Sequence, residues 1–267
     1  MKRIIIVLII LLIILVILGL DNRVTVTNYD VVDNRINSDF KIALITDTHS
    51  CDYGEKQEEL IYLLDAEKPH IILLSGDIID DEMPIEKGYE TVEEISQIAP
   101  AFYVTGNHEI WSRKSDEMKS AIRSHGITVL EGDFKTIDVN GNTINIMGVD
   151  DPSHRDYENQ IELLEDTESE GINFLLAHRP DRFNDYININ PDYIFSGHAH
   201  GGQWRFPILL EDGLLAPNQG LFPKYTKGII DVEFANLIIS RGLSRESTRI
   251  PRIYNSPEIV IINFKSE

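Results

Sequence analysis

The sequence has 267 residues, of which 42% are hydrophobic, so it can bury one full core, and one domain is the default expectation. Acidic residues outnumber basic residues by 44 to 24, which gives a formal net charge of -20. This charge excludes nonspecific nucleic-acid binding, which depends on Lys and Arg contacts to phosphates, and gives no attraction to anionic membrane surfaces. The single cysteine, Cys51, excludes a disulfide framework and a thiolate zinc site.

The N-terminus carries a long apolar run. Residues 4–20 are apolar apart from Gly19, and as a helix they extend about 25 Å, at the short end of what crosses a bilayer. Lys2 and Arg3 precede the run and favour the cytoplasmic side. Because no small-x-small cleavage pair is present, we expect an uncleaved, single-pass signal-anchor over residues 1–22, with a cleaved signal peptide as the alternative. Residues 23–267 would then form a globular domain outside the cytoplasm, anchored to the cell membrane.

Behind this run, hydrophobic patterns predict strands that alternate with helices. Strands are predicted at 24–27, 41–46, 71–74, 101–104, 172–177, 193–195 and 258–264. Helices are predicted over 55–67, 88–98 and 157–167. Hairpins are predicted from 134–139 with 143–149, joined by Asn140-Gly141, and from 229–233 with 237–240. We therefore predict an α/β protein with two packed sheets, largely parallel, and helices outside.

A glycine-rich segment near residue 200 contains two closely spaced histidines. His198 and His200 stand two residues apart directly after an apolar run, so on extended backbone both rings reach the same side. Paired imidazoles are the commonest beginning of a transition-metal site. Taken alone, the pair is equally compatible with a solvated polar turn.

Other polar residues share this setting, because each lies at or shortly after the end of a predicted strand. The full set is Asp47, His49, Asp77, Asn107, His178, His198 and His200. Ligands of open α/β sheets gather at the carboxyl ends of strands, so these side chains are expected to meet. Two carboxylates, four imidazoles and one amide oxygen, without thiolates, indicate a pair of Mn²⁺, Fe²⁺/Fe³⁺ or Zn²⁺ ions. Taken singly, Asp47 and Asp77 are equally well explained as helix N-caps.

The order of five short motifs resembles the calcineurin-like metallophosphoesterase family. The motifs are Asp47-x-His49, Gly76-Asp77-x-x-Asp80, Gly106-Asn107-His108-Glu109, His178, and Gly197-His198-x-His200. Each is weak alone, but five in order across most of the chain after residue 22 are highly specific. Gly201-Gly202-Gln203 and His178-Arg179-Pro180-Asp181 are similar to the bacterial membrane-associated branch of the family. The resemblance implies a four-layer α/β/β/α sandwich with a dinuclear site at a sheet edge.

The resemblance also implies a role for each residue. Asp47, His49 and His200 would hold the first metal, Asn107, His178 and His198 the second, and Asp77 would bridge the two. A metal-bridging hydroxide would attack phosphorus, His108 would be the general acid, and Asp80 would orient it. The implied substrate is a phosphomonoester, phosphodiester or diphosphate, with a lipid-linked or envelope-derived ester as one option.

The chain departs from the family pattern at two places. Ser50-Cys51 stands where many relatives have glycine after the first motif, and Asp81 stands where the protein phosphatases of the family carry arginine. The second departure argues against protein phosphatase activity. Candidate phosphate contacts are Arg179, Arg205, Arg241 and Arg252. The alternative from another class is a catalytically silent metal-binding scaffold or interaction protein on the same fold, against which the intact His108 argues.

Overall fold

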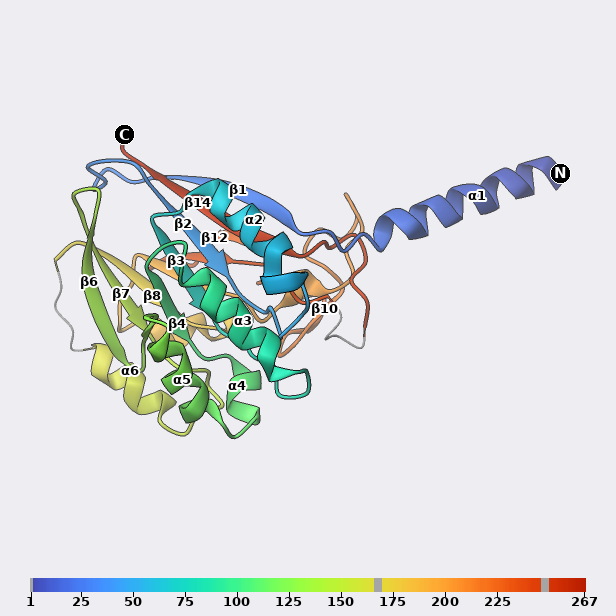
Figure 1. The fold of residues 1–267 in the computed structure, drawn as a ribbon. Helices are drawn as coiled ribbons and strands as arrows, with labels where there is room; N and C mark the ends of the chain where they lie inside the picture. Colours follow the sequence, from blue (N-terminus) through green and yellow to red (C-terminus); the bar gives the residue numbers. More distant parts are fainter. Residues whose placement is uncertain (1, 166–169, 246–249) are drawn as a thin grey trace.

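The computed structural model describes residues 2–165, 170–245 and 250–267. Two six-stranded sheets pack face to face, and helices lie on their outer faces, which gives four layers in the order helix, sheet, sheet, helix (Figure 1). The predicted α/β class with two packed sheets is therefore confirmed.

The first sheet contains the strands that begin and end the globular part of the chain. Its spatial order is β1 (Thr25–Val32), β14 (Glu258–Lys265), β2 (Phe40–Ile45), β3 (Ile71–Ser75), β4 (Ala101–Val104) and β5 (Thr128–Val129). All neighbouring pairs are parallel except β14 with β2. The last strand is thus inserted between the first two.

The second sheet is parallel at its centre and antiparallel at both edges. Its order is β12 (Gly228–Asp231), β13 (Asn236–Ile239), β9 (Tyr193–Ser196), β8 (Ile172–Leu176), β7 (Asn142–Gly148) and β6 (Asp133–Val139). The two antiparallel edge pairs, β12 with β13 and β6 with β7, are the two predicted hairpins. A separate small pair consists of β10 (Leu215–Ala216) and β11 (Gly220–Leu221).

The helices bury their apolar stripes on the outer faces of the sheets. The first sheet is covered by α2 (Glu58–Glu67), α3 (Ile85–Ile95) and α5 (Ser115–Ser124), and the second by α6 (Tyr157–Glu165). Short helical segments are α4 (Asn107–Trp111), η1 (Glu55–Gln57), η2 (Pro180–Tyr186) and η3 (His200–Gly202). The helix predicted over 88–98 begins and ends three residues earlier, and positions 166 and 167 of the predicted 157–167 helix lie outside the described residues.

Aromatic side chains fill the space between the two sheets. Phe174 packs against Phe195 and Phe264 with ring centroids 5.1 Å apart in both pairs. Burial of such rings supplies most of the driving force that holds two sheets together. The rigid sandwich fixes the strand ends from which the site residues emerge.

The N-terminal helix α1 (Lys2–Gly19) projects away from the sandwich (Figure 1). In the part of the chain that the structure describes, no helix combines the length and the apolar character needed to cross a membrane. The transmembrane span expected over residues 4–20 is therefore not supported.

Candidate metal centre

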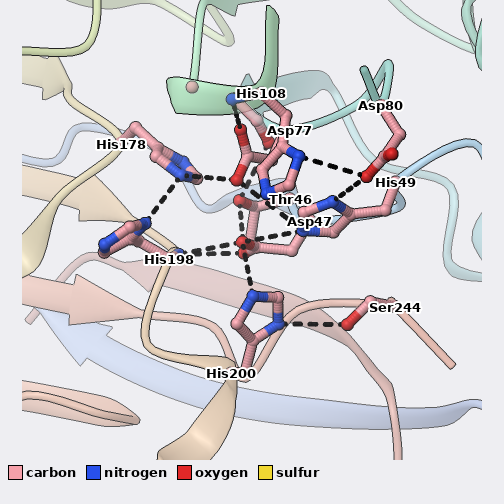
Figure 2. A network of polar contacts seen from close by, with 12 residues as sticks. Thr46, Asp47, His49, Asp77, Asp80, His108, His178, His198, His200 and Ser244 are labelled. Carbon is pink, nitrogen blue, oxygen red and sulfur yellow. Dashed lines mark hydrogen bonds and ion pairs between the residues drawn. The ribbon is translucent and has the colours of Figure 1, made fainter. Parts of the chain in front are cut away.

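The seven predicted metal ligands all follow the carboxyl ends of central strands. Asp47 and His49 follow β2, Asp77 follows β3, Asn107 begins α4 after β4, His178 follows β8, and His198 and His200 follow β9. These strands belong to both sheets, and their ends meet at one edge of the sandwich. All seven side chains are buried except that of His200, which keeps 12% of its surface exposed. Figure 2 shows the labelled carboxylates and imidazoles pointing toward one another.

The backbone at these positions is locally strained. Five of the seven residues have left-handed φ angles, namely Asp47 (52°), His49 (49°), Asp77 (52°), His198 (63°) and His200 (47°). Each such residue costs on the order of 1 kcal/mol or more, and such residues cluster at functional sites because the surrounding structure holds them there. The strain turns each side chain inward directly after its strand.

Two glycines permit the close approach of the loops. A Cβ atom on Gly197 would lie 2.1 Å from Thr46 Oγ1 and 2.3 Å from Asp47 Oδ2. A Cβ atom on Gly106 would lie 2.2 Å from Asp77 Oδ1. Because real Cβ contacts are never this short, any side chain at these positions would displace a carboxylate of the site.

One group of donors consists of Asp47, His49 and His200. One ligand atom from each of these residues lies within 4.8 Å of the others. The Nε2 atoms of His49 and His200 are both 3.8 Å from Asp47 Oδ1. The three residues are those assigned above to the first metal.

A second group consists of Asp77, His178 and His198, whose ligand atoms also lie within 4.8 Å of one another. His178 Nε2 is 3.1 Å from Asp77 Oδ2 and 3.2 Å from His198 Nδ1. Asp77 Oδ2 is also 3.6 Å from His49 Nε2, so this carboxylate lies between the two groups. That position suits a bridging ligand.

Two buried atoms of the cluster lack a hydrogen-bond partner. They are the side-chain oxygen of Asn107 and Nε2 of His49. Buried polar atoms are normally satisfied, and an unsatisfied one costs about 1–3 kcal/mol. An acceptor oxygen and an imidazole nitrogen are both ligands for a divalent cation, so the residues present fit a metal pair.

Hydrogen bonds from outside the cluster decide which histidine nitrogen faces it. His49 Nδ1 donates to Asp80 Oδ2 at 2.7 Å, and His178 Nδ1 donates to the carbonyl oxygen of Ser75 at 2.7 Å. His198 Nε2 donates to Asn218 Oδ1 at 2.7 Å. Such outer contacts fix the ring orientation of metal-binding histidines. His49 and His178 therefore present Nε2 to the cluster, whereas His198 presents Nδ1.

Burial and the neighbouring carboxylates shift the pKa values of two of these histidines in opposite directions. Burial disfavours a charged imidazole, but the nearby Asp77 outweighs this effect and raises the pKa of His178 to about 10. For His200, burial dominates over the attraction of Asp47 and lowers the pKa to about 3. His200 is thus a neutral ligand at pH 7, whereas His178 must release a proton when a cation binds.

The structure places two carboxylates beside His108, the predicted Asp80 and its neighbour Asp81. Asp80 was expected in this role, but its carboxylate lies 3.3 Å from His108 Nδ1 and only 2.7 Å from His49 Nδ1. Asp81 Oδ1 accepts the bond from His108 Nδ1 at 2.6 Å. Asp80 therefore orients a predicted metal ligand more directly than it orients His108, and Asp81 is the closer partner of His108.

The sequence reasoning missed three residues that support the site. Asn218 fixes His198, and Ser244 Oγ lies 3.0 Å from His200 Nδ1. The third is Glu109, which is fully buried and whose carboxylate accepts four backbone N–H bonds, from Asp77 (3.0 Å), Ile78 (2.7 Å), Ile79 (3.0 Å) and Gly106 (2.8 Å). A charged residue within a motif was the available signal for Glu109, whereas Asn218 and Ser244 lie in loops without a pattern.

The four arginines considered as phosphate contacts are Arg179, Arg205, Arg241 and Arg252, and none hydrogen-bonds to a predicted metal ligand. Arg179 makes two bonds to the buried carboxylate of Asp151, at 2.6 and 2.9 Å. Arg241 pairs with Glu258 at 2.6 Å, and Arg252 donates to two backbone carbonyl oxygens. Three of the four candidates are thus engaged elsewhere and support the surrounding loops.

Fold and site together define the class of protein: an α/β sandwich whose His and Asp clusters could bind metal ions. A family model for calcineurin-like phosphoesterases matches residues 40–202, which is more than half of the chain, and the chain belongs to this family. Its members use two divalent metal ions, in agreement with the clusters found here.

Individual relatives agree with this assignment. The chain is 29% identical over 240 residues to YkuE of Bacillus subtilis strain 168, an uncharacterized metallophosphoesterase, and the match covers 85% of this chain and 79% of the relative. It is 27% identical over 179 residues to YaeI of Escherichia coli K12, named a phosphodiesterase, with 64% of each chain covered. The fold also resembles that of TT1561 of Thermus thermophilus, with a TM-score of 0.51, 13% identity, and 77% and 91% of the two chains covered.

Proposed function

We propose that this phosphoester hydrolase works at a dinuclear centre and that phosphodiesters are its favoured substrates. The observation that carries the proposal is the position of Asp77 between two donor groups, each of which offers enough nitrogen and oxygen atoms for one cation. Asp47, His49 and His200 would hold one ion, and Asn107, His178 and His198 the other. Bound Mn²⁺, iron or Zn²⁺ would polarise phosphoryl oxygens and lower the pKa of a shared water, which supplies the hydroxide nucleophile.

The chain's own residues contribute proton transfer and orientation. His108 lies beside Asn107 without belonging to the predicted ligand set, and its backbone N–H donates to Asp77 Oδ1 at 2.9 Å. Asp81 Oδ1 accepts a hydrogen bond from Nδ1 of His108, so Nε2 is the ring nitrogen left to donate to the leaving oxygen of the ester. Protonating a leaving alkoxide is the task of a general acid.

The charge around the site supports the choice of diesters. A phosphodiester carries one negative charge, whereas a phosphomonoester carries about two at neutral pH. The guanidinium groups of Arg179, Arg241 and Arg252 already donate hydrogen bonds to other protein groups, so we infer that they do not bind the additional negative charge of a monoester. The relative YaeI is named a phosphodiesterase, which agrees with this choice.

For the location, we propose attachment to the cell membrane through the N-terminus, with residues 23–267 on the extracytoplasmic side, as in the bacterial membrane-associated branch. Lys2 and Arg3 before the apolar run support this orientation. Exposed apolar side chains next to the base of α1 support the attachment, among them Phe206 (41% exposed) and Leu209 (86% exposed). Protease added to intact spheroplasts should digest the domain; survival until lysis would refute the orientation.

The function is tested with protein loaded with Mn²⁺ and assayed against phosphodiesters, phosphomonoesters and diphosphates. We expect about two metal equivalents per chain, loss of activity on chelation, restoration by Mn²⁺, and the highest kcat/KM for a diester. One equivalent or none would contradict the dinuclear centre. A full metal complement without turnover of any ester would instead support a catalytically silent scaffold.

A further inference from the structure

An exposed tryptophan lies beside the proposed general acid. Trp111 ends α4, the short helix that carries His108, and 54% of its surface is exposed. The ring centroids of Trp111 and His108 are 5.1 Å apart, with 53° between the ring planes. Residues three apart on a helix share a face, so both rings lie on one side of α4. A large exposed aromatic ring at this place has no role in the packing of the core.

The position of His108 determines where the leaving group of the substrate lies. Nδ1 of His108 is occupied by Asp81, so the proton passes from Nε2 to the leaving oxygen. The leaving group must therefore extend from a point next to the His108 ring. We propose that Trp111 is a binding platform for this leaving group, and that the enzyme favours esters whose leaving alcohol has a planar or apolar face. This inference rests on the proposed hydrolysis and the acid role of His108.

The charge on the same side favours an uncharged leaving alcohol. The carboxylates of Asp81 and Asp80 lie 2.6 and 3.3 Å from His108 Nδ1, and 21% of the Asp81 side chain is exposed. A leaving group that carries its own phosphate, as in a diphosphate, would place negative charge near these carboxylates. Coulomb repulsion between these like charges would disfavour such a leaving group, although solvent screening reduces it. The leaving-group side thus combines an aromatic face with negative charge.

The test compares esters of benzyl alcohol and of ethanol, whose acidities are similar, in the ester class that the Mn²⁺-loaded enzyme turns over fastest. Stacking of a nucleic-acid base on an aromatic side chain contributes about 1–3 kcal/mol, or roughly 5- to 150-fold. We expect Trp111→Ala to lower kcat/KM for the benzyl ester about tenfold while the ethyl ester changes less than about twofold, and Trp111→Phe to retain most of the preference. Tyr62→Ala, which removes a 76% exposed aromatic ring from α2, is the matched control.

A binding measurement gives a readout that does not depend on turnover. In a Trp204→Phe background, Trp111 is the sole fluorescent tryptophan. We expect the monomethyl ester of 2-phenylethylphosphonic acid, a non-hydrolysable isostere of methyl benzyl phosphate, to quench this fluorescence and to bind more tightly than the monomethyl ester of propylphosphonic acid. If the two phosphonates bind with equal affinity, and the benzyl-to-ethyl ratio of kcat/KM is the same in the wild type and in Trp111→Ala, the proposed role of Trp111 is overturned. The proposed hydrolysis would not be affected by that result. Absence of turnover for every ester would instead contradict the proposed function and, with it, this inference.

Discussion

Replacing Glu109 by glutamine tests how the polypeptide holds two of the proposed ligands in place. One carboxylate oxygen of Glu109 accepts from Ile78 and Ile79, and the other accepts from Asp77 and Gly106. The amide of glutamine keeps one acceptor oxygen and presents an NH₂ group to the other two N–H donors. Two buried backbone donors then have no acceptor, at about 1–3 kcal/mol each, so the free energy of unfolding should fall by roughly 2–6 kcal/mol.

Urea denaturation measures this loss. With a denaturant slope of about 3 kcal/mol per molar, the midpoint should fall by roughly 0.7–2 M. The metal content should also fall, because these backbone N–H groups flank Asp77 and Asn107. The matched control is Glu117→Gln, which changes an exposed carboxylate on α5 and should leave both quantities unchanged. A Glu109→Gln protein with an unchanged midpoint and a full metal complement would refute the reasoning.

Three further predictions concern catalysis and stability. His108→Asn should keep both metals and lose roughly 10²–10⁴-fold in turnover, most on alkyl esters, whereas His198→Asn should lose one metal; metal loss in His108→Asn would contradict the acid role. Lys119→Met should lower the free energy of unfolding by about 3–5 kcal/mol, because Lys119 is only 1% exposed and the buried carboxylate of its partner Asp150 would lose its countercharge. An unchanged urea midpoint would refute this. The hydrogen bond from Arg35 lowers the pKa of Asp33 from 3.8 to about 2, so the stability that Arg35 adds should be present above about pH 4 and disappear as the pH falls toward 2. Because Arg35 is 45% exposed, denaturation of Arg35→Ala should show a difference below about 1 kcal/mol, and a difference that grows toward low pH would contradict the sign.

The sequence was most informative where local patterns decide the structure. Apolar runs placed the central strands, and the polar residues at their ends meet at one edge because parallel strands align their carboxyl ends there. The Asn140-Gly141 turn located one hairpin, since both positions have positive φ. The seven proposed ligands follow from the predicted strand ends and from the order of the motifs, and the structure brings their side chains together.

The sequence was least informative where a contact depends on the course of a loop. Asp80 and Asp81 are adjacent, and only the backbone turn after β3 decides which carboxylate reaches His108. Asn218 reaches His198 from a loop that carries neither periodicity nor a motif. The membrane span predicted from 4–20 was not supported by the structure.

The place of β14 has a consequence for how the chain folds. β14 lies between β1 and β2 and pairs with both, in registers that join Thr25 to Glu258 and Phe40 to Phe264. While the chain is being synthesised, β1 and β2 therefore lack a shared neighbour until β14 has left the ribosome. Contacts between such distant segments slow folding, because a long loop must close before they form. The first sheet of the sandwich is thus completed only after every strand of the second has been synthesised, and deletion of β14 would separate β1 from the other strands of its sheet.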